Sequence, residues 1–156
     1  EILKRLTDKN VRLIVGGNWS ENRLRTAFQR RVAREGLGNR VELTGLIDDR
    51  MKDKLFSEAR VLVHPIVEAF GMMGLEAAAH GCPLIMPKGS GVTELFEDGV
   101  HGFFPAEGDL ETFIERISLL LSDERKAWQL GKAAWEVAKR CTWADHVHRI
   151  ASVMPK

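Results

Sequence analysis

Glu68-Ala69-Phe70-Gly71-Met72-Met73-Gly74-Leu75-Glu76 lies between a predicted strand and a predicted helix. Residues 60–65 before it form a β-branched and aliphatic run closed by a proline, which predicts a buried strand. Residues 77–81 after it predict a small-faced helix that ends at a glycine. The two glycines between the glutamates are positions where a backbone can come close to a ligand. Free N–H groups at a helix N-terminus bind phosphate, and carboxylates accept hydrogen bonds from hydroxyls, so the stretch suits a ligand with both groups.

Strands and helices alternate along the rest of the chain. Further strands are predicted at residues 11–15, 41–45, 84–87 and 102–104. Helices are predicted at residues 20–37, with Ser20 as N-cap, from the 46–49 loop to residue 59, at 109–121 and 122–140, and from 142 onward. Thr142 and Asp145 resemble a capping box at the start of the last helix. This alternation predicts an α/β fold with a parallel sheet, whose ligands bind outside the carboxyl ends of the strands.

Several glycines and one histidine follow these strands directly. Gly16, Gly45, His64 and the 89–91 loop each come after a predicted strand. We therefore expect them to line one edge of the sheet together with residues 68–76.

Glu68 and Glu76, eight positions apart around Phe70-Gly71, resemble the E-x7-E signature of retaining glycosyltransferases with the GT-B fold, group 1, family 4. Residues 11–17, 41–45, 81–85, 91–94 and 98–102 also occur in the order and spacing of that family's C-terminal domain. The resemblance covers essentially the whole chain. It implies a Rossmann-like, doubly wound parallel sheet in one domain, residues 1–156, forming the C-terminal half of a GT-B fold.

The resemblance also implies a donor that is a nucleotide-diphosphate sugar, such as a UDP- or GDP-sugar. Glu76 would hold the ribose hydroxyls, and Glu68 would bind a donor-sugar hydroxyl near the reacting carbon. The backbone at Phe70, Gly71 and Met72 would contact the sugar or the diphosphate. The remaining candidates for binding the nucleotide sugar are Gly16, Gly45, Leu46, Ile47, His64 and Glu94.

Two of these candidates have ordinary structural readings beside the functional one. His64 is equally well explained as a core histidine at a strand end, and Glu94 as a first-turn glutamate favoured by the helix dipole. Ser90 and Thr93 depart from the family pattern, which has Gly-Gly and a proline before the glutamate.

The family's arginine and lysine that neutralise the diphosphate would lie upstream of Glu1, as would the acceptor-binding domain. We therefore expect a chain truncated at its N-terminus that catalyses no transfer by itself and binds nucleotide diphosphates poorly. With the central strand of the 3-2-1-4-5-6 order absent, the strands at Val11 and Val61 would pair directly or leave unpaired edges. We expect direct pairing.

Composition is that of an ordinary globular domain. Among 156 residues, 23 Lys and Arg face 22 Asp and Glu, a net charge of +1 that gives no case for nucleic acid. No apolar run approaches the roughly 18 residues of a membrane span, and no metal-ligand cluster or signal peptide is visible. The family usually needs no metal or other cofactor. Cys82 and Cys141 read as buried thiols in a reducing cytosol.

Two features bear on partners. The arginine-rich helix at residues 20–37 reads as a solvated face in preference to a membrane or polyanion surface. In GT-B enzymes a C-terminal helix often crosses to the N-terminal domain, but core packing is the preferred reading of Trp143.

The resemblance also implies an enzyme of the hexosyltransferase type in polysaccharide or glycolipid synthesis. Its acceptor is a glycan or glycolipid and its location cytoplasmic, with peripheral contact at the cytoplasmic membrane face left open.

Two alternatives stay open. A sugar-nucleotide epimerase or phosphorylase has the same fold, although the order of the motifs favours the glycosyltransferase. A non-catalytic nucleotide-binding or protein-interaction module is the second alternative.

Overall fold

The structure, a computed structural model, describes residues 1–154, except for the side chain of Arg149. The chain divides into two compact units, Glu1–Lys52 and Asp53–Lys156. We describe each unit by itself. The expectation of a single domain stays a prediction.

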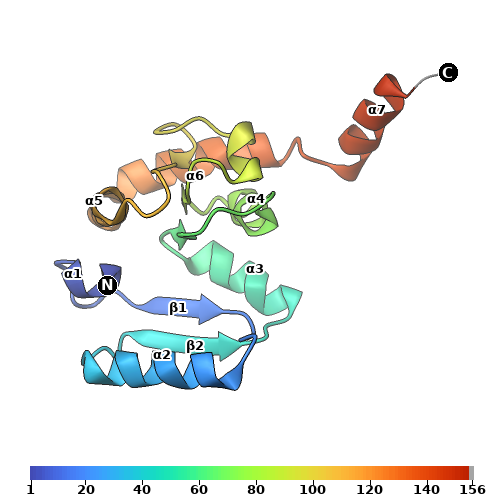
Figure 1. Ribbon diagram of the computed structural model, residues 1–156. Coiled ribbons are helices and arrows are strands. Elements are labelled where there is room, and N and C mark those ends of the chain that lie inside the picture. Colours follow the sequence, from blue (N-terminus) through green and yellow to red (C-terminus); the bar gives the residue numbers. More distant parts are fainter. Residues whose placement is uncertain (155–156) are drawn as a thin grey trace. The chain divides into compact units, whose positions relative to one another are not determined.

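The first unit contains a two-stranded parallel sheet. Its elements are α1 (Ile2–Arg5), β1 (Leu13–Gly16), α2 (Asn22–Arg34), β2 (Val41–Gly45) and the first turn of α3 (Asp49–Glu58). Leu13 pairs with Val41, and a register shift after Val15 brings Gly16 opposite Gly45. Helix α2 runs beside this sheet, as Figure 1 shows.

Helix α2 differs from its expected form at its start. It begins at Asn22, Glu21 occupies the N-cap position, and no side chain caps it, so the expectation that Ser20 is the N-cap was wrong. None of the residues of α2 is buried, and the preference for a solvated face over a membrane or polyanion surface stays a prediction. The exposed Arg31, for example, pairs with Glu35, the residue just beyond the end of the helix.

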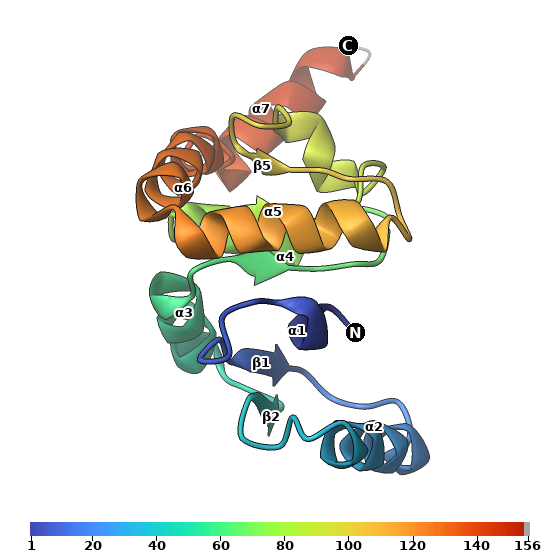
Figure 2. The same ribbon diagram turned by 90° about the vertical axis from the view of Figure 1, so that its left-hand side faces the viewer.

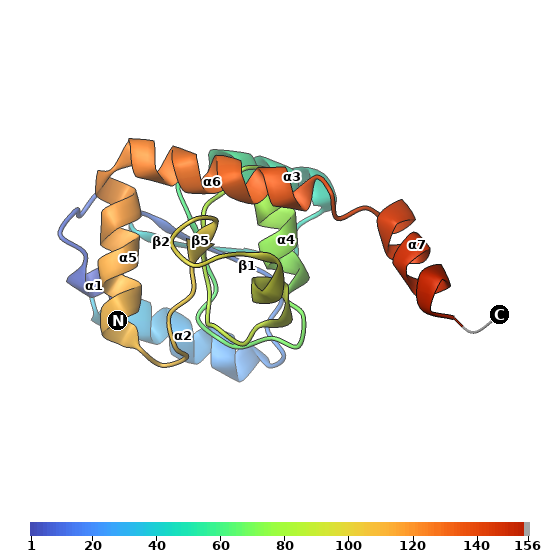
Figure 3. The same ribbon diagram turned by 90° about the horizontal axis from the view of Figure 1, so that it is seen from above.

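The second unit contains a three-stranded parallel sheet in the order β3-β4-β5. Its elements after α3 are β3 (Leu62–Val63), α4 (Met72–Ala79), β4 (Leu84–Ile85), the 3-10 helix η1 (Gly91–Leu95), β5 (Gly102–Phe103), α5 (Leu110–Ser122), α6 (Glu124–Ala138) and α7 (Trp143–Val153). Helices α4 and α5 both contact β4, and α6 contacts α4, α5 and β5. Figures 2 and 3 show these helices arranged around the sheet. The prediction of an α/β fold with parallel strands is confirmed.

The central strand β4 forms the core of this unit. Leu84 and Ile85 are fully buried, and Met86, directly after them, is nearly so. A strand covered by helices on both faces reads as a continuous apolar run, which is why residues 84–86 carry no polar side chain.

The helix ends follow the sequence signals closely. Gly81 has a φ of +71° just beyond α4, as the glycine there predicts. Asp109 and Asp123 cap α5 and α6 through hydrogen bonds from the amides of Thr112 and Lys126. At α7 the hydroxyl of Thr142 accepts the Asp145 amide, which confirms the predicted capping box in its main contact.

Except for β2, the strands are shorter than expected, and their ladders lie within each unit. Within the described residues β1 pairs only with β2, and β3 only with β4. Each of these two strands pairs with the next strand along the chain through a helical crossover. Because β1 and β3 belong to different compact units, the expectation that the strands at Val11 and Val61 pair directly stays a prediction.

Two readings of single side chains also need correction. Trp143 is 81% exposed, so it does not pack in the core, because α7 projects away from the sheet of its unit (Figure 3). Cys82 is buried as expected, but Cys141 is exposed at the turn that precedes α7.

Candidate functional site

The loop that joins β3 to α4 carries the first candidate residues. It starts at His64, whose amide donates a hydrogen bond to the carbonyl of Ile85 in β4 at 2.9 Å. Since β3 and β4 are parallel, the loop lies at the carboxyl end of the sheet, where ligands of α/β folds bind. The sheet therefore fixes the starting point of the loop.

Glu68 lies in the middle of this loop and is held by the loop after β4. Its amide donates to the hydroxyl of Ser90 at 3.2 Å, and its carbonyl accepts from the amide of Gly91 at 3.2 Å. Its side chain is 43% exposed, and one carboxylate oxygen, Oε1, lies 3.1 Å from Nε2 of His64. Glu68 thus has a fixed backbone and a carboxylate that solvent can reach.

Helix α4 begins with uncommitted amide groups. Gly71 occupies the N-cap position with a φ of +90°, and no side chain caps the helix. Within the part of the chain that the structure describes, the amides of Phe70, Gly71 and Met72 donate to no protein acceptor. The first amides of a helix have no partner inside the helix and carry a partial positive charge. These groups can therefore donate hydrogen bonds to an anion.

The two glycines of the stretch have a packing role that the sequence reading missed. A Cβ on Gly74 would lie 2.8 Å from the sulfur of Met86, and one on Gly71 would lie 3.2 Å from Val92. The space that the missing Cβ atoms leave is therefore next to core side chains and not next to a ligand. This packing seats the N-terminal turn of α4 against Met86 and Val92.

Glu76 and Glu94 lie on the two helices that follow the loops. Glu76 is half-buried in the second turn of α4, and its carbonyl lies 2.8 Å from Nδ1 of His80. Nε2 of the same His80 ring lies 3.3 Å from Asp53 on α3. Glu94 is exposed in the 3-10 helix η1.

The candidates in the first unit gather at the carboxyl end of its own sheet. Gly16 pairs with Gly45, and the amide of Gly17 donates to the Gly45 carbonyl at 2.9 Å. A Cβ on Gly16 would lie 3.5 Å from the end of the Ile47 side chain. Leu46 is 78% exposed.

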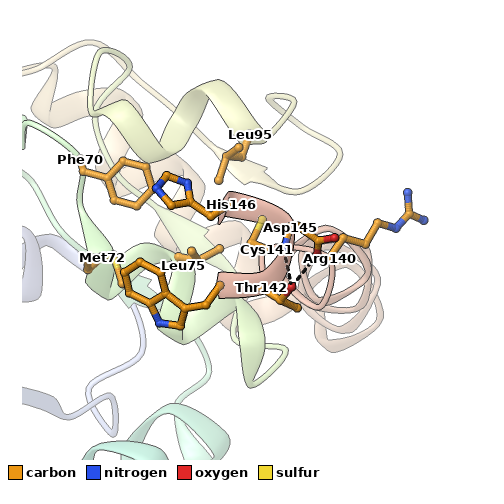
Figure 4. A pocket seen from close by; sticks show the side chains of 10 residues that line it. Phe70, Met72, Leu75, Leu95, Arg140, Cys141, Thr142, Asp145 and His146 are labelled. Atoms are coloured by element: carbon orange, nitrogen blue, oxygen red, sulfur yellow. Dashed lines mark hydrogen bonds between the residues drawn. The ribbon is translucent and has the colours of Figure 1, made fainter. Parts of the chain in front are cut away.

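An apolar cavity of about 410 Å³ lies beside α4 in the second unit. Phe70, Met72, Leu75 and Leu95 line it together with Trp143 and His146 of α7. Figure 4 shows the ring of His146 next to that of Phe70. The side chains of Phe70 and Met72 therefore face this cavity, which leaves their amides as the groups available to an anion. Sequence reasoning missed the cavity, because nothing local in residues 140–146 signals a contact with residues 70–75.

Neither a metal-ligand cluster nor a membrane-spanning helix is present among the described residues. No group of three or more His, Cys, Asp or Glu side chains is arranged to hold a metal ion. No helix among these residues combines the length and hydropathy that crossing a bilayer requires.

The fold agrees with the comparison to known families. Residues 1–137 match the family described as glycosyl transferases group 1, and the chain belongs to that family. The chain is 28% identical to D-inositol 3-phosphate glycosyltransferase of Corynebacterium diphtheriae over 158 aligned positions, 98% of the chain and 36% of that protein. It is 35% identical to a sucrose synthase of Acidithiobacillus caldus over 60% of the chain and 12% of that protein. The chain thus spans about a third or less of the length of these curated relatives.

Solved structures confirm the fold. The Anabaena protein HepE, in complex with UDP and glucose, superposes with a TM-score of 0.85 at 24% identity, over 98% of this chain and 43% of that one. The C-terminal domain of the group 1 glycosyl transferase LpcC of Francisella tularensis superposes with a TM-score of 0.71 at 16% identity, over 90% and 92% of the two chains. At these identities the likeness establishes the fold, which is that of the C-terminal domain of GT-B glycosyltransferases.

Proposed function

We propose that this chain is the donor-binding part of a retaining glycosyltransferase and that residues 68–76 bind a nucleotide-diphosphate sugar. The observation that carries the proposal is the entry into α4. The three unpartnered amides of Phe70, Gly71 and Met72 lie there between the carboxylates of Glu68 and Glu76 in sequence. Amides suit the diphosphate and carboxylates suit the hydroxyls of the sugar and ribose.

The chemistry that this arrangement serves is the departure of the diphosphate. In the transfer, the bond between the anomeric carbon and the diphosphate oxygen breaks, and the acceptor oxygen bonds to that carbon with the configuration kept. The acceptor hydroxyl passes its proton to the departing diphosphate oxygen in the same process. Preorganised amides that stabilise the charge developing on the leaving group are usually the largest single catalytic effect in such reactions. In this proposal Glu68 binds a hydroxyl of the transferred sugar and Glu76 the ribose.

The remaining candidates are proposed with smaller roles. In the first unit we assign the backbone of Gly16 and of residues 45–47 to a contact with the nucleotide base. In the second unit we assign to Glu94 a contact with the nucleotide sugar. His64 lies beside Glu68 and acts on the sugar through that residue. A glycan or glycolipid acceptor, a separate acceptor-binding domain, the absence of a cofactor and a cytoplasmic location stay predictions.

Product analysis tests the proposed activity. The full-length protein that carries this chain is incubated with UDP- and GDP-sugars, with and without acceptor glycans. We expect release of the nucleoside diphosphate and a new glycoside, with the anomeric configuration of the donor, only when acceptor is present. A changed sugar epimer without acceptor would show an epimerase, and sugar phosphate formed from a glycoside and inorganic phosphate would show a phosphorylase. Either result contradicts the proposal.

A matched variant links that activity to the site. Glu68→Gln keeps the size of the side chain and removes its charge, and because the side chain is 43% exposed we expect folding to be unaffected. We expect a large loss of transfer rate with an unchanged melting temperature. Normal specific activity in this variant would remove Glu68 from the site.

A further inference from the structure

Ser90 is the starting point. It is fully buried, with 0% of its surface exposed, and no other polar or charged residue is buried among those that the structure describes. Its hydroxyl oxygen accepts the amide of Glu68 at 3.2 Å across 22 residues of sequence. A buried hydroxyl is costly unless it is hydrogen-bonded, so this bond gives Ser90 a defined task.

The two residues after Ser90 continue the same contact. The Gly91 amide donates to the Glu68 carbonyl at 3.2 Å, and the Val92 amide donates to the Phe70 carbonyl at 2.6 Å. The two backbone segments lie so close together that a Cβ on Gly91 would lie 2.4 Å from the carbonyl oxygen of Ala69. Both backbone groups of Glu68 are thus bound by consecutive residues of one neighbouring loop.

His64 acts on the side chain of the same residue. Its Nε2 lies 3.1 Å from Oε1 of Glu68, within ion-pair distance, although the atoms are not aligned as a hydrogen bond. That nitrogen is buried and has no hydrogen-bond partner among the described residues. The backbone of His64 is fixed to β4 through Ile85, so the ring restricts where the Glu68 carboxylate can go.

We propose that Ser90 and His64 are positioning residues for Glu68: Ser90 fixes its backbone and His64 confines its carboxylate toward the donor sugar. The inference rests on the proposed function of Glu68. It assigns a use to the serine that stands where the family pattern has glycine, since a glycine has no hydroxyl to accept the Glu68 amide. Neither residue is assigned a contact with the nucleotide.

The test separates sugar binding from nucleotide binding. The affinities of UDP and UDP-glucose, and of GDP and GDP-glucose, are measured by NMR titration of the chain, and the pair that binds is used. We expect Ser90→Ala and His64→Ala each to weaken binding of the nucleotide sugar by about three- to tenfold, the effect of losing one polar contact to Glu68, with binding of the nucleoside diphosphate unaffected. Ser57→Ala is the matched control. The exposed Ser57 hydroxyl donates a hydrogen bond to the carbonyl of Lys54 in α3, so its removal should change neither affinity.

Conservative variants and a double-mutant cycle exclude a merely structural role. Ser90→Cys keeps a weak hydrogen-bond acceptor, and His64→Gln keeps a polar N–H group. Each should therefore bind the nucleotide sugar more tightly than the corresponding alanine variant does. If Ser90→Ala does not fold, Ser90→Cys carries the test. In a Glu68→Gln background, neither Ser90→Ala nor His64→Ala should reduce the nucleotide-sugar affinity further, because all three act through one carboxylate.

The outcomes are distinguishable. The quantity compared is the ratio of the affinity for the nucleotide sugar to the affinity for the nucleoside diphosphate. If Glu68→Gln leaves this ratio unchanged, the proposed function of Glu68 is wrong. If Glu68→Gln lowers the ratio while Ser90→Ala and His64→Ala do not, only the positioning inference is overturned. Equal loss of affinity for the sugar nucleotide and the bare diphosphate in these variants would also overturn it, because that pattern indicates general damage to the loop.

Discussion

At the scale of single residues, the proposed site combines the unpartnered amides at the start of α4 with the carboxylates of Glu68 and Glu76. Glu76 is half-buried in α4, close in sequence to the unpartnered amides at Phe70 and Gly71. A hydrogen bond to a charged carboxylate contributes roughly 1.5–3 kcal/mol, and loss of the charge removes much of it. In the proposed function the Glu76 carboxylate binds the ribose hydroxyls, so its removal should be felt in nucleotide affinity.

We expect Glu76→Gln to weaken binding of the nucleoside diphosphate about tenfold or more, with an unchanged fold. Calorimetry on the full-length protein, or NMR titration of the chain, measures the change. Glu115→Gln, at an exposed position of α5, is the matched control. Unaltered affinity in Glu76→Gln would remove Glu76 from the nucleotide site.

The two cysteines should differ sharply in reactivity. Burial raises the pKa of the Cys82 thiol to about 12, while a hydrogen bond from the Leu62 backbone opposes this weakly. The thiolate is the reactive form, so at pH 8 Cys82 is protonated and inert. We expect a disulfide reagent to label only Cys141 in the native protein and both cysteines in denaturant. Rapid labelling of Cys82 in the native state would contradict its burial.

At the scale of elements, the packing of α6 on the end of α4 depends on one glycine. A Cβ on Gly131 would lie 1.9 Å from the carbonyl oxygen of Gly81. Gly81 lies just beyond the end of α4, so α6 meets this turn at a point where neither residue has a side chain.

We expect Gly131→Ala to lower the free energy of unfolding by about 2 kcal/mol. Alanine gains about 1 kcal/mol of helix propensity over glycine, but overpacking against a backbone atom costs more than that gain. Gln129→Ala, at an exposed position of the same helix, is the control and should be near neutral. Urea unfolding measures both, and a stabilised Gly131→Ala variant would show that the crossing relaxes freely.

The elements also show what sequence reasoning can reach. The ends of α4, α5 and α7 were predicted well because Gly81, Asp109 and Thr142 act on amides or turns within a few residues. Strand lengths were overestimated: residues 60–65 were predicted as a strand, but only Leu62–Val63 has ladder partners. A ladder depends on a second strand, which local composition does not describe.

The same distinction holds for the site. The stretch 68–76 was recognised from its own residues, including both glutamates and the amides before α4. The contact of Ser90 with Glu68 spans 22 residues and had no signal beyond the departure of Ser90 from the family pattern. The exposure of Trp143 was missed because an apolar side chain in a predicted amphipathic helix reads as core.

At the scale of the whole molecule, the two compact units are unequally packed. In the first unit the buried apolar residues are Leu3 and Leu6, while Leu13 and Ile14 of β1 are 38% and 43% exposed. The main buried cluster, from Phe56 to Ala138, lies in the second unit. Local stability follows the amount of buried apolar contact, so the first unit should open more readily.

We expect amide hydrogens of β1 and β2 to exchange roughly tenfold faster or more than those of β4 under native conditions. Hydrogen exchange followed by mass spectrometry or NMR measures this directly. Equal protection of the two sheets would mean that the chain opens as one cooperative unit.

The central claim is that residues 68–76 bind the diphosphate and sugar of a nucleotide sugar. The most direct measurement is an NMR titration of the chain with UDP-glucose and GDP-glucose, up to a concentration on the order of ten millimolar so that weak binding is detected. We predict that the amides of Phe70, Gly71 and Met72 shift most, and that Glu76→Gln moves the same titration to higher ligand concentration. If these three amides do not shift while others do, or if neither nucleotide sugar shifts any amide, the account is contradicted.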